Sequence, residues 1–86
     1  MNKHTAVLPD GNISTRNSAS RTYTHAVAYK QVVAGIEDPR WYVASYAGNL
    51  ALAEKAKAGL EARFFHKRNE NHFAGTAFAI VEVQVA

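Results

Sequence analysis

The fold is decided by the stretch WYVASYAGNLALAEKAKAGLEARFFH, which covers residues 41–66 of an 86-residue chain. Residues 41–46 are rich in aromatic side chains and predict a strand. Gly48 lets the chain turn, and Asn49 has the side chain of a helix N-cap. Residues 50–66 are rich in Ala, Leu, Glu and Lys, which are the best helix formers. We therefore expect a strand that leads directly into a long helix.

The predicted helix has one apolar stripe, with members at steps of three and four residues. Its members are Leu50, Ala53, Ala56, Leu60 and Phe64. We expect the stripe to pack on the strand predicted for residues 76–85, whose small face carries Ala77, Ala79, Val81, Val83 and Val85. Gly59 costs a helix about 1 kcal/mol relative to Ala, so we expect it to allow a close approach of helix and sheet.

Upstream of this stretch, residues 21–33 predict the clearest strand of the chain. Strict alternation would place Tyr23, His25, Val27 and Tyr29 on one face. Residues 34–40 predict a turn, and residues 5–16 predict a hairpin closed by the turn Pro-Asp-Gly-Asn. The element order is then β-β-β-β-α-β, or β-β-α-β if residues 5–16 are irregular.

One helix cannot cover both faces of such a sheet. We therefore expect a single α+β domain over residues 1–86, with two layers. An antiparallel-rich sheet of four or five strands carries the helix on one face. The other face is left for water, a partner or a second copy of the chain, which would give a homodimer.

Composition narrows the class of protein. Hydrophobic residues make up 48% and charged residues 20%, which is typical of a globular domain. We see no apolar run of the roughly 18–20 residues that a membrane span needs, and no secretory h-region follows Met1. Cysteine is absent, which excludes disulfides and thiol catalysis and suits a reducing compartment. We expect a cytoplasmic protein without a membrane partner.

Catalytic and metal-binding signatures are missing from the sequence. There is no Gly-x-Ser-x-Gly, Walker A or Gly-x-Gly-x-x-Gly motif, and the carboxylates are scattered apart from Glu37-Asp38 in a predicted turn. His66 and His72 lack the Cys or Asp neighbours of a metal site. We expect a non-enzymatic protein with no cofactor and no metal.

Binding is the remaining class of function. The net charge is +3, which fits either solubility or a polyanionic partner. Exposed aromatic rings beside cations can stack nucleic acid bases or form a protein interface. Neither an RRM-like strand motif nor a KH loop is present. The candidate binding residues are Arg21, Tyr23, His25, Tyr29, Trp41, Arg63, Lys67 and Arg68.

Residues 10–60 resemble small uncharacterised proteins of bacteriophages and other mobile elements. The resemblance rests on Arg-Thr-Tyr-Thr-His at residues 21–25, the Trp strand at 41–46 and the Ala-rich helix. It implies an inhibitor that binds and blocks a host macromolecular machine, as anti-CRISPR and other anti-defence proteins do. The host complex would be a protein or a defence nucleoprotein. The alternative is a small basic module that binds DNA or RNA through an aromatic sheet face.

Overall fold

The computed structural model describes residues 2–66 and 71–85 of the chain. Within them it has the elements β1 (Asn2–Val7), β2 (Ile13–Ser18), β3 (His25–Lys30), β4 (Val32–Val33), β5 (Ile36–Glu37), β6 (Tyr42–Ala47), α1 (Leu50–Phe64) and β7 (Ala77–Val85). This is the predicted α+β class, with the N-terminal hairpin present as β1 and β2. None of the helical structure in these residues is long and apolar enough to span a lipid bilayer.

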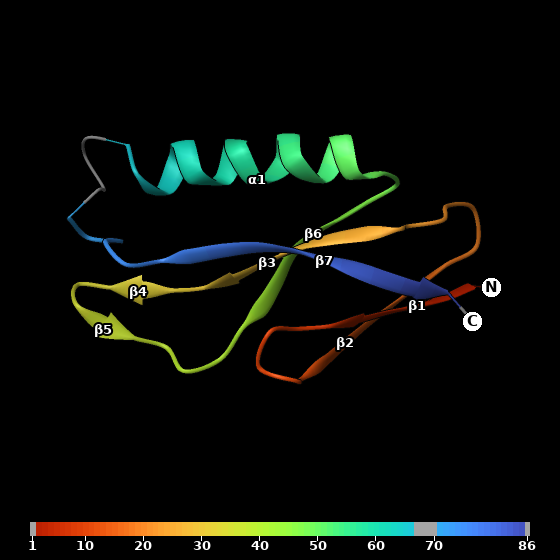
Figure 1. Ribbon diagram of the computed structural model, residues 1–86, viewed down its shortest axis with the longest axis horizontal. Coiled ribbons are helices and arrows are strands. Elements are labelled where there is room, and N and C mark those ends of the chain that lie inside the picture. Colours follow the sequence, from red (N-terminus) through yellow and green to blue (C-terminus); the bar gives the residue numbers. More distant parts are fainter. Residues whose placement is uncertain (1, 67–70, 86) are drawn as a thin grey trace.

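Five strands form an antiparallel sheet in the order β2-β1-β7-β3-β6. The last strand, β7, lies at its centre between β1 and β3, a position that suits a strand with apolar residues on both faces. In Figure 1 the helix α1 runs along one side of this sheet, and the first and last strands, β1 and β7, lie side by side. Strands β4 and β5 form a separate small hairpin.

The helix begins where the sequence predicts. The Asn49 side-chain oxygen accepts a hydrogen bond from the Leu52 backbone N–H at 2.8 Å. The helix buries Ala53 against Val27 of β3 and Ala47 of β6, and Ala56, Leu60 and Ile80 pack around this cluster. Phe64 extends it, because its ring lies 5.3 Å from that of Phe78.

Two details of this packing were predicted wrongly. The helix packs on the Phe78 and Ile80 face of β7, whereas Val81 and Val83 belong to the core on the other face. Leu50 is outside the helix core, since 48% of its surface is exposed. The small face of β7 instead contributes to the second core, where Val83 is buried with Ala6 and Ala26.

The second face of the sheet is closed by the sheet itself. Ala6, Ala26 and Val83 are buried there, with Val43, Tyr46 and Val81 packed against them. The outer strands β2 and β6 meet across this face, where the Ser14 hydroxyl and the Tyr46 hydroxyl are 3.1 Å apart. The prediction of a bare face was therefore wrong, because a strongly curled sheet can bury its concave side without a second helix.

The predicted strand 21–33 is interrupted at both ends. Arg21–Thr24 lie outside β3, and the Tyr23 ring packs on Tyr46 of the concave face at 5.6 Å. His25 lies opposite Ala47, which faces the helix. Tyr23 and His25 therefore point to opposite faces, and the prediction of one common aromatic face was wrong.

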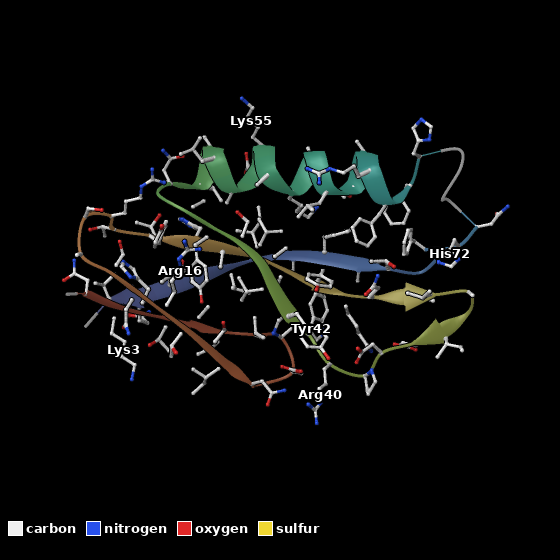
Figure 2. All side chains as sticks on the ribbon, turned by 180° about the vertical axis from the view of Figure 1, so that it is seen from behind. Lys3, Arg16, Arg40, Tyr42, Lys55 and His72 are labelled. Carbon is white, nitrogen blue, oxygen red and sulfur yellow. The ribbon has the colours of Figure 1, made fainter. Side chains whose placement is uncertain are left out.

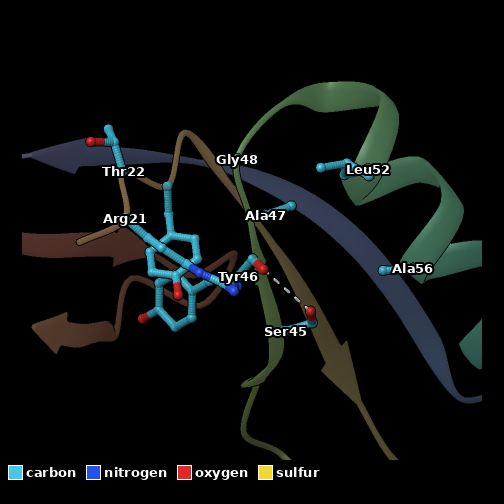
Figure 3. A pocket seen from close by; sticks show the side chains of 9 residues that line it. Arg21, Thr22, Ser45, Tyr46, Ala47, Gly48, Leu52 and Ala56 are labelled. Atoms are coloured by element: carbon cyan, nitrogen blue, oxygen red, sulfur yellow. Dashed lines mark hydrogen bonds between the residues drawn. The ribbon is translucent and has the colours of Figure 1, made fainter. Parts of the chain in front are cut away.

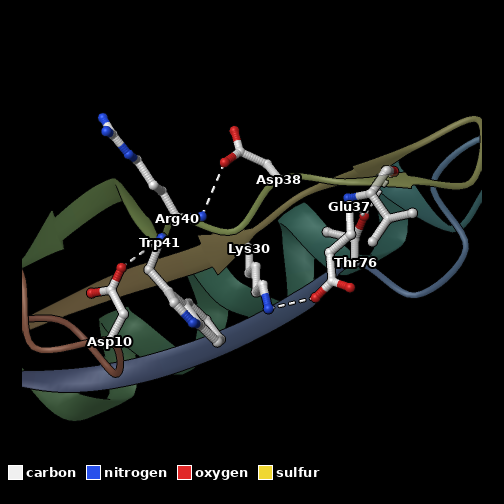
Figure 4. Close-up of polar contacts among 8 residues, drawn as sticks. Asp10, Lys30, Glu37, Asp38, Arg40, Trp41 and Thr76 are labelled. Atoms are coloured by element: carbon white, nitrogen blue, oxygen red, sulfur yellow. Dashed lines mark hydrogen bonds and ion pairs between the residues drawn. The ribbon is translucent and has the colours of Figure 1, made fainter.

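Residues 32–37, where the sequence predicts the end of a strand and a turn, form the β4–β5 hairpin. Its two loop residues, Ala34 and Gly35, have φ of 51° and 81°, the pattern of a type I′ turn. The buried Thr76 hydroxyl accepts a hydrogen bond from the Val32 N–H at 3.0 Å. An ion pair joins Lys30 to Glu37 (Figure 4). These contacts hold the hairpin beside the start of β7.

Candidate functional site

A groove lies between α1 and the outer strand β6. The link between them is only Gly48 and Asn49, so the helix must start next to the strand that precedes it. Ala47 is buried under the helix, and its small side chain keeps the two elements close at this end. The groove follows both elements away from this tight link.

The first half of the groove has a volume of about 480 Å³. Figure 3 shows Arg21 and the Tyr46 ring on one side of it and Leu52 with Ala56 of the helix on the other. It is lined by Arg21, Thr22, Tyr23, Ser45, Tyr46, Ala47, Gly48, Leu52 and Ala56. Apart from Arg21, the lining is apolar or hydroxylic.

The second half has a volume of about 540 Å³ and shares Ser45, Leu52 and Ala56 with the first. The two halves are therefore one continuous groove, which we call the α1/β6 groove. The second half is lined by Ala44, Ser45, Leu52, Lys55, Ala56, Gly59, Leu60 and Arg63. Half of these residues are small: Ala44, Ser45, Ala56 and Gly59.

Gly59 contributes an opening in the helix wall. A Cβ atom built at Gly59 would meet no atom within 4 Å, so the prediction that this glycine brings helix and sheet together was wrong. The missing side chain widens the groove and leaves the packing of the protein unaffected.

The sheet-side wall of the groove rests on a buried aromatic cluster. His4 is fully buried and meets the Tyr23 ring edge-on at 5.0 Å. Its Nδ1 lies 3.3 Å from the Arg16 carbonyl oxygen, to which it can donate. The Arg16 guanidinium lies 5.3 Å from the centre of the Tyr23 ring and 5.7 Å from that of Tyr46. Cation–π contacts of this kind hold both tyrosines in place.

The predicted binding residues separate into four sets. Arg21, Tyr23 and Arg63 line the α1/β6 groove, although Tyr23 is only 8% exposed and is mainly a core residue. His25 and Tyr29 are half-buried on the helix face, where Tyr29 packs against Tyr42 at 5.8 Å. Trp41 lies apart from them, near Asp10. Lys67 and Arg68 lie outside the described residues.

Among the described residues, Asp10 and Tyr42 have shifted pKa values, and both lie outside the groove. Hydrogen bonds from the backbone N–H of Asn12 and of Trp41 lower the pKa of Asp10. Figure 4 shows the contact with Trp41. The hydrogen bond that Tyr42 donates to Asp38, 3.1 Å long, raises the pKa of Tyr42. Both groups are exposed, and their contacts tie together the loops around Asp10, Asp38 and Trp41.

The groove has the chemistry of a binding surface. Its lining, all within the described residues, contains no Asp, Glu or His. Among residues 2–66 and 71–85, no three potential ligands come together to hold a metal ion. What the groove does offer is three cations, several small residues and an exposed leucine.

The sequence prediction missed the groove residues Leu52, Lys55 and Gly59. Leu52 lies outside the apolar stripe and is 53% exposed, and Gly59 is a poor helix former in the middle of a helix. Both are local departures from the pattern of a simple amphipathic helix, and together they could have marked this side of α1. Comparison of the chain with protein family models, curated proteins and solved structures finds no match.

Proposed function

We propose that this protein is a non-enzymatic binding protein that blocks a partner macromolecule, and that the α1/β6 groove is its contact surface. The observation that carries the proposal is Gly59. A glycine inside a helix costs about 1 kcal/mol relative to Ala. A Cβ atom built at Gly59 would meet no atom within 4 Å apart from its chain neighbours and the adjacent helix backbone, so packing within the protein does not explain the missing side chain. A ligand that occupies the groove would need this space, which explains why residue 59 is a glycine.

The exposed apolar surface of the groove supports the same proposal. Leu52 lies where the two halves meet and is half exposed, and Leu50 nearby is exposed to a similar extent. Apolar side chains inside a concave, polar-rimmed surface are typical of sites that a partner covers.

The nature of the partner follows from the resemblance to small phage and mobile-element proteins. On that basis we propose a host protein complex as the target, bound in the host cytoplasm, with inhibition of anti-CRISPR or anti-defence type as the result. The net charge of +3 favours an acidic protein surface.

Nucleic acid is the second candidate partner, favoured by the cations Arg21, Lys55 and Arg63 at the groove. The aromatic stacking platform expected from the sequence is not accessible, because Tyr23 is buried. Phosphate binding by these cations alone would weaken steeply as salt increases.

Capture of partners from host lysate tests the proposal. Three baits are compared: the unchanged protein, Gly59→Trp, which fills the groove, and Ala58→Trp, which adds the same bulk at an exposed helix residue outside the groove lining. We expect the same protein to be retained, after nuclease treatment, by the unchanged and Ala58→Trp baits only. Circular dichroism confirms that each bait is folded. Equal retention by Gly59→Trp would reject the groove as the contact surface, and loss with nuclease would favour nucleic acid.

A further inference from the structure

We infer that the α1/β6 groove takes an extended, acidic polypeptide segment of about five residues. The inference rests on the proposed function and specifies the chemistry of the bound segment. Three features of the groove carry it: its charge, its length with its apolar floor, and the outer edge of β6.

The charge of the groove has one sign. Arg21 lines one half, and Lys55 and Arg63 line the other. None of the described lining residues is acidic, so carboxylates brought into the groove would meet cations at both ends. Charge complementarity of this kind directs specificity and association rate.

The length and floor of the groove fit a short extended chain. From Leu52 to Arg63 the helix rises 1.5 Å per residue, or about 16 Å in all, which five extended residues span at about 3.3 Å each. Leu52 and Ala56 form an apolar floor where the two halves of the groove meet, and Gly59 leaves room for one side chain of the ligand. A segment that alternates acidic and small apolar residues matches both features.

Strand β6 supplies backbone hydrogen-bonding groups. It is an outer strand of the sheet, paired on one side with β3. Its pairing register shifts at Ala44, where a bulge interrupts the ladder opposite Val27 and Ala28. Bulges bend an edge and oppose the addition of a long strand. A short segment along Ser45–Ala47 lies on one side of the bulge and avoids this restriction.

A polypeptide fits the groove better than a nucleic acid strand does. Bases need exposed aromatic faces to stack on. The two tyrosines of the groove are occupied, since Tyr23 is buried and the Tyr46 ring packs on Tyr23 with its hydroxyl bound to Ser14. The leucine and alanine floor suits aliphatic side chains.

The test uses nuclear magnetic resonance titration of the full chain with the synthetic peptide Glu-Leu-Glu-Ala-Glu. The matched probes are Lys-Leu-Lys-Ala-Lys and a five-nucleotide oligothymidine. We expect the acidic peptide alone to shift the backbone amide signals of Ala44–Gly48 and Leu52–Arg63. In the protein Lys55→Glu/Arg63→Glu its affinity should fall at least tenfold. The control Lys3→Glu/Arg40→Glu makes the same change in net charge at exposed sites away from the helix (Figure 2), and should change affinity less than twofold.

Three results would overturn the inference: shifts confined to other regions such as the β4–β5 hairpin, equal weakening by both charge-reversed pairs, or stronger binding of oligothymidine at the same amides. Absence of any shift at millimolar acidic peptide would also overturn it. These failures are distinct from failure of the proposed function. If Gly59→Trp still abolishes capture of the cellular partner, the groove remains the contact surface and only the acidic segment is rejected.

Discussion

The Ser14 hydroxyl lies 3.1 Å from the Tyr46 hydroxyl, and this hydrogen bond connects the two outer strands of the five-stranded sheet. The residues belong to β2 and β6, which have three strands between them in the sheet order. The outer strands can meet only because the sheet curls. Ala6, Ala26 and Ala28 are fully buried on the inside of this curl, where larger side chains would hold the strands apart.

The contact between the outer strands should contribute measurable stability. We expect Tyr46→Phe and Ser14→Ala each to lower the free energy of unfolding by about 0.5–1.5 kcal/mol, the range for a partly buried hydrogen bond. Because both changes remove the same bond, the double variant should be little less stable than either single one. Urea denaturation of the four proteins measures the coupling. Strictly additive losses would show that the two hydroxyls do not interact in solution.

Tyr23 should behave as a core residue. It packs against His4 and Tyr46 beneath the Arg16 guanidinium, and only 8% of its surface is exposed. Truncation of a buried aromatic residue typically costs 3–5 kcal/mol, so we expect Tyr23→Ala to lower the melting temperature severely or to prevent folding. Tyr29→Ala, at a half-buried position, is the comparison and should cost less. If Tyr23→Ala leaves the melting temperature unchanged, Tyr23 is a surface residue and its assignment to the core is wrong.

Leu60 and Leu50 both belong to the predicted apolar stripe, but only Leu60 packs in the core. Leu60 packs on the cluster around Val27, whereas Leu50 is 48% exposed. We expect Leu60→Ala to cost about 2 kcal/mol, at the lower end for buried leucines, and Leu50→Ala less than about 0.5 kcal/mol. Chemical denaturation compares the two. Equal costs would return Leu50 to the core.

Local sequence signals predicted the elements of this fold well, and long-range contacts account for the errors. The Asn49 cap and the apolar steps of the helix are local, and the structure confirms them except at Leu50. The face of the sheet to which the Tyr23 side chain points depends on whether the strand stays regular over residues 21–25. That is decided by pairing with β6 and β7, which are distant in sequence: the Thr24 N–H bonds to the Ala47 carbonyl and the Val83 N–H to the Thr24 carbonyl.

The α1/β6 groove could not be predicted from the sequence either, because it also depends on long-range contacts. Arg21 and Arg63 were predicted as binding residues because they are cations beside aromatic residues, and the structure places them along the same groove. The sequence could not indicate that β6 would be an outer strand, because strand order follows from the position of β7 in the sheet. The sequence therefore gave no reason to expect that Leu52 and Lys55 would line a groove beside β6.

Asp10 should make stability depend on pH in acid. The N–H groups of Asn12 and Trp41 bond to its carboxylate and lower its pKa in the folded state below the ordinary value of 3.8. The resulting stabilisation is complete above the unfolded pKa and is lost as pH falls through the folded pKa. Between pH 5 and pH 2 (about one unit above to two below the ordinary pKa), Asp10→Asn should therefore lose less stability than the unchanged protein. Urea midpoints measured across this range check the slope, and parallel profiles would contradict the assignment.

Gly59→Ala should make the protein more stable. An added methyl group meets no atom within 4 Å, so the gain in helix propensity of about 1 kcal/mol is not offset by a clash. For a domain of this size we expect the melting temperature to rise by roughly 4–8 °C. Gly35→Ala is the matched control: it also has open space around it, but its φ of 81° is strained for alanine, so the melting temperature should fall. A decrease with Gly59→Ala would mean that the helix does need this glycine for its own packing, and the argument from Gly59 to a ligand in the groove would lose its basis.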